Sequence, residues 1–187
     1  MGLCGLLTPL VAFSAIAISI ALSPWFSWAR NALSDLGALN SPVWPIFNTG
    51  LVMAGLLASR FSYGILRGAE GGLEKAGSVL LLAGSVSLAL IGLLPEDTGL
   101  PHFLVSVAFF FLTPLGFLIL GLRDLRGPNR AYSALMVIFS LASLTTWASW
   151  ACFRPPVGIA VPELIAALLS SASLVLLTSK ALRGTGA

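Results

Sequence analysis

Residues 76–90 read AGSVLLLAGSVSLAL, a stretch without a charged side chain inside an apolar run of about residues 74–94. A helix needs about 20 mostly apolar residues to cross the hydrocarbon core of a bilayer. The run lacks the period-2 alternation of a barrel strand, and backbone polar groups in lipid must pair internally. The stretch therefore predicts a transmembrane helix. Its small residues would allow close approach of neighbouring helices: Gly77, Ala83, Gly84 and Ser85.

Five more runs of the same kind surround this one. They cover about residues 2–22, 43–66, 101–122, 131–152 and 159–181. Charged residues make up 9% of the chain, against about 25% in soluble domains. We expect an all-α integral membrane bundle of six transmembrane helices, forming a single domain over residues 1–187. The first run lacks a basic leader and is longer than the apolar core of a signal peptide, so we expect it to be retained; its cleavage would leave five spans.

The basic residues are distributed unequally between the two sides that six spans define. Eight of the ten fall on the side of the chain ends: Arg60, Arg67, Lys75, Arg123, Arg126, Arg130, Lys180 and Arg183. Only Arg30 and Arg154 fall on the other side, where all five tryptophans also map. Cytoplasmic loops are enriched in Lys and Arg, and tryptophan favours the membrane interface. We expect a multi-pass protein of the cell membrane with both termini in the cytoplasm.

The basic side also bears on partners. Topology and attraction to anionic lipid headgroups explain its charge. No folded domain would present these residues to a nucleic acid, so we expect no nucleic-acid partner. Membrane lipids are the expected partners, together with another membrane protein or a second copy of the chain.

A polar segment, WARNALSDLGALN at residues 28–40, separates the first two spans. If it is helical, Asn31, Ser34 and Asp35 share one face, because residues three and four apart are neighbours on a helix. We therefore expect a short interfacial or re-entrant helix here. Its polar face would turn towards the starts of the second and fourth spans.

Further polar residues map to the same, extracytoplasmic side, and they include four of the seven acids and the single histidine. The candidate catalytic residues are Asp35, Asp97 and His102. The candidate ligand-binding residues are Arg30, Asn31, Ser34, Asn48, Glu96, Arg154 and Glu163. Asn48 lies six residues beyond Pro42, which places its amide roughly 9 Å into a span, where it needs a partner inside the bundle.

Each of these residues also has an ordinary structural interpretation. Asp97 could cap the fourth helix, and Glu163 could interact with the dipole of the sixth helix. Asp35 could be a local cap or a solvated loop charge. Asn48 could be a hydrogen-bonding contact between helices, and His102 a satisfied interfacial residue. Either arginine of this side could pair with an acid or with a lipid phosphate. The case for a site therefore depends on the convergence of these residues on one side of the membrane.

Four short motifs carry a resemblance to a known family: Asn-x-x-Ser-Asp-x-Gly at 31–37, Phe-Asn at 47–48, Pro-Glu-Asp at 95–97, and His102 at the start of the fourth span. In these the chain resembles the domain-of-unknown-function 998 (DUF998) family of prokaryotic six-span membrane proteins. The resemblance covers roughly residues 5–180 and is specific in the first four helices. It implies that the 28–40 segment, Asn48 and His102 form one unit.

A more distant resemblance joins the chain to the DRAM, FRAG and Sfk type of eukaryotic membrane proteins. These share a Ser-Asp-x-Gly outer loop, here residues 34–37, and a histidine that opens a later helix, here His102. Some members are linked to lipid-anchor remodelling or to autophagy. Neither resemblance implies a particular reaction.

Two classes of function fit these observations. We favour a non-catalytic membrane module that binds a lipid or another membrane protein. The alternative is an outer-leaflet, lipid-modifying hydrolase in which Asp35 or Asp97 orients His102 for general acid–base catalysis. In a metal-assisted version, the carboxylates and the imidazole would bind a divalent ion such as Mn²⁺, Ca²⁺ or Mg²⁺ that activates water.

Several other functions are disfavoured. Ser34 or Ser106 could serve as a nucleophile, but the chain has no G-x-S-x-G or H-E-x-x-H motif. With one histidine, bis-histidine haem ligation within one chain is excluded, and we expect no haem. A transporter is disfavoured because no charge lies at the centre of a span.

Overall fold

The computed structural model describes residues 2–184, except for the side chain of Arg183, one of the basic residues counted above. The architecture is all-α, with eight elements: α1 (Gly2–Ala21), η1 (Ser34–Gly37), α2 (Trp44–Gly68), α3 (Gly72–Leu93), η2 (Glu96–Thr98), α4 (Leu100–Asp124), α5 (Arg130–Phe153) and α6 (Ala160–Gly184). All six α-helices are long and apolar enough to cross a membrane. Six such helices therefore occupy the six predicted runs, to within three residues at every end.

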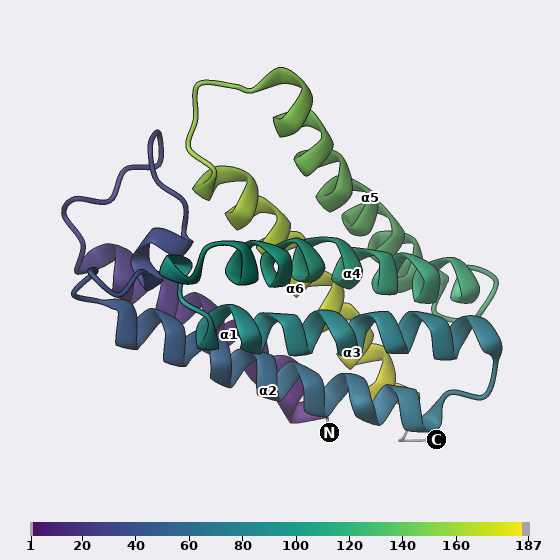
Figure 1. Cartoon of the computed structure of the whole chain (residues 1–187). Helices are drawn as coiled ribbons and strands as arrows, with labels where there is room; N and C mark the ends of the chain where they lie inside the picture. Colours follow the sequence, from purple (N-terminus) through teal and green to yellow (C-terminus); the bar gives the residue numbers. More distant parts are fainter. Residues whose placement is uncertain (1, 185–187) are drawn as a thin grey trace.

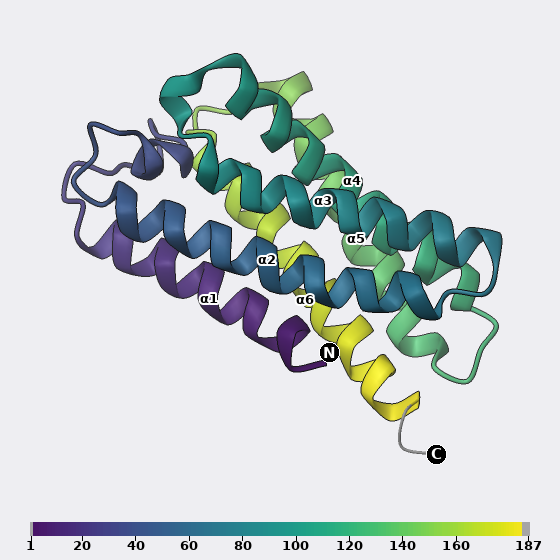
Figure 2. The same ribbon diagram turned by 60° about the horizontal axis from the view of Figure 1, so that its bottom comes forward.

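The six α-helices form a bundle in which each packs against the next along the chain and α6 returns to pack against α1. The start of α1 and the end of α6 lie near each other in both views (Figures 1 and 2), and Gly2 lies against the Leu182 side chain. We name the side of the chain ends, with connections 69–71 and 125–129, the terminus end. The side with connections 22–43, 94–99 and 154–159 is the loop end.

Helix α3 is the most buried helix, and α5 is the least buried. Small residues bring α3 close to both of its neighbours. Gly55 of α2 lies directly against the backbone of Ala89, and Gly84 lies against Thr113 of α4. Helix α5 instead leans away from α4 towards the loop end (Figure 1). The bundle is therefore tightly closed around α3 and looser between α4 and α5.

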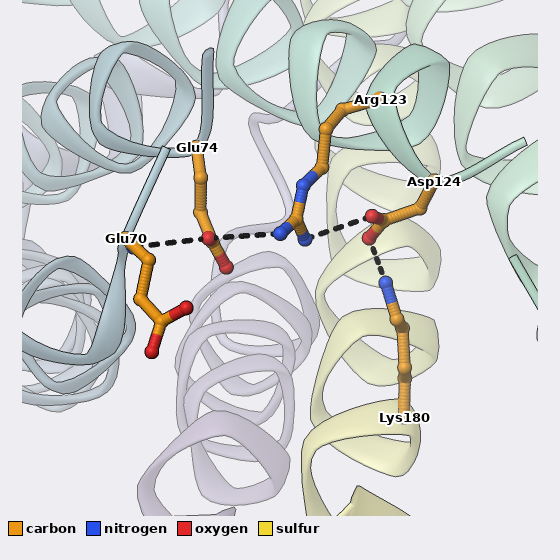
Figure 3. A network of polar contacts seen from close by, with 5 residues as sticks. All are labelled: Glu70, Glu74, Arg123, Asp124 and Lys180. Atoms are coloured by element: carbon orange, nitrogen blue, oxygen red, sulfur yellow. Dashed lines mark hydrogen bonds and ion pairs between the residues drawn. The ribbon is translucent and has the colours of Figure 1, made fainter. Parts of the chain in front are cut away.

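A network of ion pairs joins three helices at the terminus end (Figure 3). The Arg123 guanidinium of α4 lies 3.0 Å from Glu74 of α3 and 2.8 Å from the neighbouring Asp124. Asp124 also pairs with Lys180 of α6, and Glu74 accepts a hydrogen bond from the Glu70 amide at 3.3 Å. The network neutralises part of the basic charge at this end and ties the ends of α3, α4 and α6 together.

The segment 28–40 differs from the helix expected there: its only regular element is the single 3₁₀ turn of Ser34–Gly37. The Asp35 carboxylate accepts hydrogen bonds from the Asn31 side chain at 2.5 Å and from the Ala32 amide at 3.1 Å. Side chains of this kind compete with backbone carbonyls for amide donors and favour turns over helices. Asn31 and Asp35 do face each other, but as partners within a turn.

Candidate functional site

The segment 28–40 is fixed first by the connection between α5 and α6. The Gly158 amide donates to the Trp28 carbonyl at 2.9 Å, and the Ala160 amide donates to the Asn31 carbonyl at 3.0 Å. One turn into α6, the Glu163 carboxylate accepts the Leu33 amide at 2.6 Å. The sequence placed this segment towards the second and fourth spans and gave no sign of its contact with the sixth.

Two further hydrogen bonds hold the other half of the segment. The Asp97 carboxylate accepts the Leu39 amide at 2.6 Å, and the buried Asn48 amide donates to the Gly37 carbonyl at 2.9 Å. Asp97 therefore binds the neighbouring loop, and α4 begins without a side-chain cap. The buried Asn48 side chain therefore has the hydrogen-bond partner that its depth requires, and the 28–40 segment supplies it through the Gly37 carbonyl.

His102 lies in the first turn of α4, is 8% exposed, and has its Nδ1 atom 2.7 Å from the Leu94 carbonyl oxygen. A carbonyl only accepts hydrogen bonds, so Nδ1 carries a proton and Nε2 of the neutral ring is an acceptor. At Nδ1 the ring is thus oriented by a backbone carbonyl, and orientation of His102 by Asp35 or Asp97 stays a prediction. The short connection between α3 and α4 brings a backbone carbonyl back to the ring, and both acids accept amides of the 28–40 segment.

Three acids of the loop end lie close to Glu96. Burial, then a hydrogen bond with Asp35, then the charges of Asp35 and Asp97 raise the pKa of Glu96 to about 7. Glu163 lies within electrostatic range of both Glu96 and Asp35. Near neutral pH Glu96 is therefore partly protonated, with the Asp35 side chain beside it.

The two arginines of this side do not neutralise these acids. Arg30 and Arg154 are both exposed, and Arg154 ends α5 in a left-handed conformation with a φ of 41°. Among the side chains described, neither arginine forms an ion pair, and the ion pairs gather instead at the terminus end. The loop end thus combines four neighbouring carboxyl groups with no cationic partner.

A cavity of about 360 Å³ lies beneath the loop end, between α4, α5 and α6. Its polar lining consists of Ser34, Glu96, His102, Ser106 and Glu163. Its apolar lining is dominated by Phe103, Val107, Phe110, Phe111 and Trp147. The Phe110 and Trp147 rings pack with their centroids 4.9 Å apart. The cavity is therefore polar on the side of the loops and aromatic along α4 and α5.

The structure separates the predicted site residues into groups. Ser34, Glu96, His102 and Glu163 line this cavity. Asn31 and Asp35 line a neighbouring pocket of about 460 Å³ on the outer side of the 28–40 segment. Asn48 and Asp97 hold that segment in place, while the two arginines line neither space.

The aromatic wall was missed from the sequence, although α4 carries a signal for it. Phe103, Val107, Phe110 and Phe111 recur at the spacing of one helical face. In a chain this apolar, such a face looks like any surface that contacts lipid. The neighbouring sequence of Trp147 did not indicate that this residue lines the cavity, because its position there depends on how α5 packs against α4.

The chemistry available to the cavity is hydrogen bonding and charge. Within residues 2–184 no three His, Cys, Asp or Glu side chains are grouped so that they could hold a metal ion. Among the described residues, no hydrogen bond joins His102 to Ser34 or to Ser106. The lining offers carboxyl oxygens and an imidazole nitrogen to a ligand that donates hydrogen bonds.

The proton on Glu96 predicts a pH dependence of stability. The folded chain retains this proton up to a pKa of about 7, whereas the ordinary value is 4.5. The contribution of Glu96 to stability therefore falls as the pH rises from about 4.5 to about 7, and it does not change further above that pH. Glu96→Gln keeps an N–H donor for Asp35 and should flatten the change in thermal midpoint between pH 5 and pH 8. Glu70→Gln, at the terminus end, is the control. An equal fall in thermal midpoint from pH 5 to pH 8 in the unchanged protein, Glu96→Gln and Glu70→Gln would contradict the assignment of the pH dependence to Glu96.

Comparison with known proteins identifies one family. The model described as "Protein of unknown function (DUF998)" matches residues 6–180. No curated protein and no solved structure matches the chain significantly. The match covers nearly all of the six helices and the three loop-end connections that line the cavity.

Proposed function

Because the chain belongs to the DUF998 family, whose function is unknown, we propose a function from its cavity: it is a lipid-binding module of the cell membrane. Both termini lie in the cytoplasm, as the distribution of basic residues predicts. The loop end then lies at the outer face, with the 28–40 segment at the interface. The cavity binds the headgroup and upper chain region of an outer-leaflet lipid.

The observation that carries this proposal is the division of the cavity into a polar and an aromatic part. Ligand sites are typically hollows of about 300–1,000 Å³ with an apolar lining and a few polar groups that fix orientation. This cavity has that size and composition. Its aromatic side reaches the surface of α4, where Phe103 is 61% and Phe111 is 43% exposed. A lipid can therefore enter sideways from the hydrocarbon while its headgroup remains at the loops.

The position of exposed tryptophans supports the same placement. Trp25, Trp28 and Trp44 are exposed at the loop end, and such rings favour the level of the lipid headgroups. The exposed face of α5 remains available to lipid, to another membrane protein or to a second copy of the chain.

Filling the cavity tests the proposal. Ser106→Leu adds a branched side chain to the lining, and we expect it to reduce the binding of a spin-labelled phospholipid about tenfold or more, since about 1.4 kcal/mol corresponds to tenfold in affinity. Ser14→Leu, an exposed position on α1, is the matched control and should bind as the unchanged protein does. Equal binding by all three proteins would place the lipid elsewhere.

A lipid-modifying reaction is the second candidate, favoured by one observation: Glu96, with a pKa of about 7, and His102, with a free Nε2, line the same cavity. Groups that titrate near the working pH are suited to general acid–base catalysis. Mass spectrometry of the lipid after incubation with the protein decides between the two. Unchanged lipid supports the binding module, and a product that Ser106→Leu abolishes supports the enzyme.

A further inference from the structure

We infer that the cavity selects a lipid whose headgroup carries a protonated primary amine. This inference rests on the proposed lipid-binding function and adds the class of lipid. It follows from the charges and hydrogen-bonding groups that the structure brings to the polar part of the cavity.

The first argument is charge. Glu96 and Glu163 both line the cavity, and Asp35 lies directly behind Glu96. No lysine or arginine lines the cavity. Carboxylates that are partly removed from water are costly unless a cation pairs with them. An anionic headgroup would add to this repulsion, whereas an ammonium group would supply the missing positive charge.

The second argument is independent of the acids. His102 is more than nine-tenths buried and lines the same cavity, and in the described chain its Nε2 makes no hydrogen bond. Since Nδ1 donates to Leu94, Nε2 of the neutral ring needs a donor. The polar part of the cavity therefore offers acceptors from Glu96, Glu163 and His102. A primary ammonium has three N–H donors, whereas a quaternary ammonium has none.

The aromatic lining points to the lipid part of the ligand. Phe103, Phe111 and Trp147 line the cavity beyond its polar part, and Phe103 and Phe111 also reach the exposed surface of α4. The glycerol and upper acyl-chain region of a phospholipid can cover these apolar rings, whereas a free amine that occupies only the polar part leaves them uncovered. We therefore assign the amine to a lipid and not to a soluble molecule.

Competition between lipids tests the inference. The full-length chain in detergent micelles is offered equimolar phosphatidylethanolamine, phosphatidylcholine and phosphatidylglycerol with identical acyl chains at pH 8, and bound lipid is counted by native mass spectrometry. We expect phosphatidylethanolamine to exceed each of the others about tenfold, the size of one hydrogen bond to a charged group. Free ethanolamine at the same concentration should leave the bound lipid in place.

Variants locate the selectivity. Glu163→Gln keeps an oxygen for the Leu33 amide but removes the charge, and Glu96→Gln keeps the donor to Asp35. Both should lose the preference for phosphatidylethanolamine while still binding lipid. Glu70→Gln makes the same change at the exposed terminus end and should keep the preference.

The remaining outcomes separate the two proposals. If the three lipids bind equally and Ser106→Leu still reduces their binding, the amine inference is overturned and the lipid-binding function is kept. A preference that survives both Glu163→Gln and Glu96→Gln would move the selectivity to another site and overturn the inference. If free ethanolamine displaces the bound lipid, the assignment of the amine to a lipid headgroup is overturned. The absence of bound lipid would overturn the proposed function itself.

Discussion

Replacing Gly55 by alanine is expected to lower the free energy of unfolding by about 1–3 kcal/mol, the usual cost of overpacking a closed interface. A Cβ atom at this position would lie 2.3 Å from the Ala89 nitrogen and 2.6 Å from its Cα. These are backbone atoms of α3, so no side-chain rotation relieves the clash. Helices α2 and α3 must therefore separate around this contact.

Alanine is the better helix former by about 1 kcal/mol, so the overpacking must exceed this gain for the protein to be destabilised. Gly68→Ala is the control on the same helix, because a Cβ there meets no atom within 4 Å. The fraction folded is followed during titration with denaturing detergent. Equal midpoints for both variants would show that α2 and α3 do not approach as described.

The second prediction concerns the support of the cavity. In Gly158→Ala a Cβ would lie 2.5 Å from the Asn31 carbonyl oxygen and 2.8 Å from the Trp28 carbonyl oxygen. The connection before α6 would then be pushed off the 28–40 segment, and Glu163 would move with it away from Leu33. We expect about 1–3 kcal/mol of lost stability and, because the polar part of the cavity is built across this contact, about a tenfold or greater loss of lipid binding.

The two effects of this substitution are measured separately. Detergent titration gives the stability, and spin-labelled phospholipid gives the binding, at a detergent concentration where the bundle remains folded. Gly71→Ala, in the connection at the terminus end, has open space around its Cβ and should change neither. Full lipid binding by folded Gly158→Ala would show that the contact between the two loops does not shape the cavity.

The sequence was sufficient for the six helices because insertion in a bilayer depends on local composition. A run of about 20 apolar residues has a favourable free energy of transfer into the hydrocarbon core. Its backbone N–H and C=O groups must pair within the run, so it forms a helix. The depth of Asn48 in its span likewise predicted that its amide needs a hydrogen-bond partner, and the Gly37 carbonyl is that partner. The order of the spans also brought the polar residues to one end of the bundle, since alternate connections of an even-numbered bundle lie on the same side.

Local composition was not sufficient for the segment 28–40. A helical spacing of polar residues predicted a helix, whereas Asn31 and Asp35 use their side chains to close a turn. Short polar side chains can satisfy the same amides that a helix would, and the choice between the two depends on the backbone partners that other helices provide.

By itself, then, the sequence determined the number, extent and polarity of the helices and which end collects the polar side chains. Only the tertiary structure decided which of these side chains meet. The hydrogen bond from Leu33 to Glu163 joins residues 130 positions apart, and the cavity lining joins α4 to Trp147 of α5 and Glu163 of α6. The physical reason is that lipid-facing and helix-facing apolar residues have nearly the same transfer free energy. Hydropathy therefore determines which segments form membrane helices, whereas side-chain packing determines which helices lie next to each other.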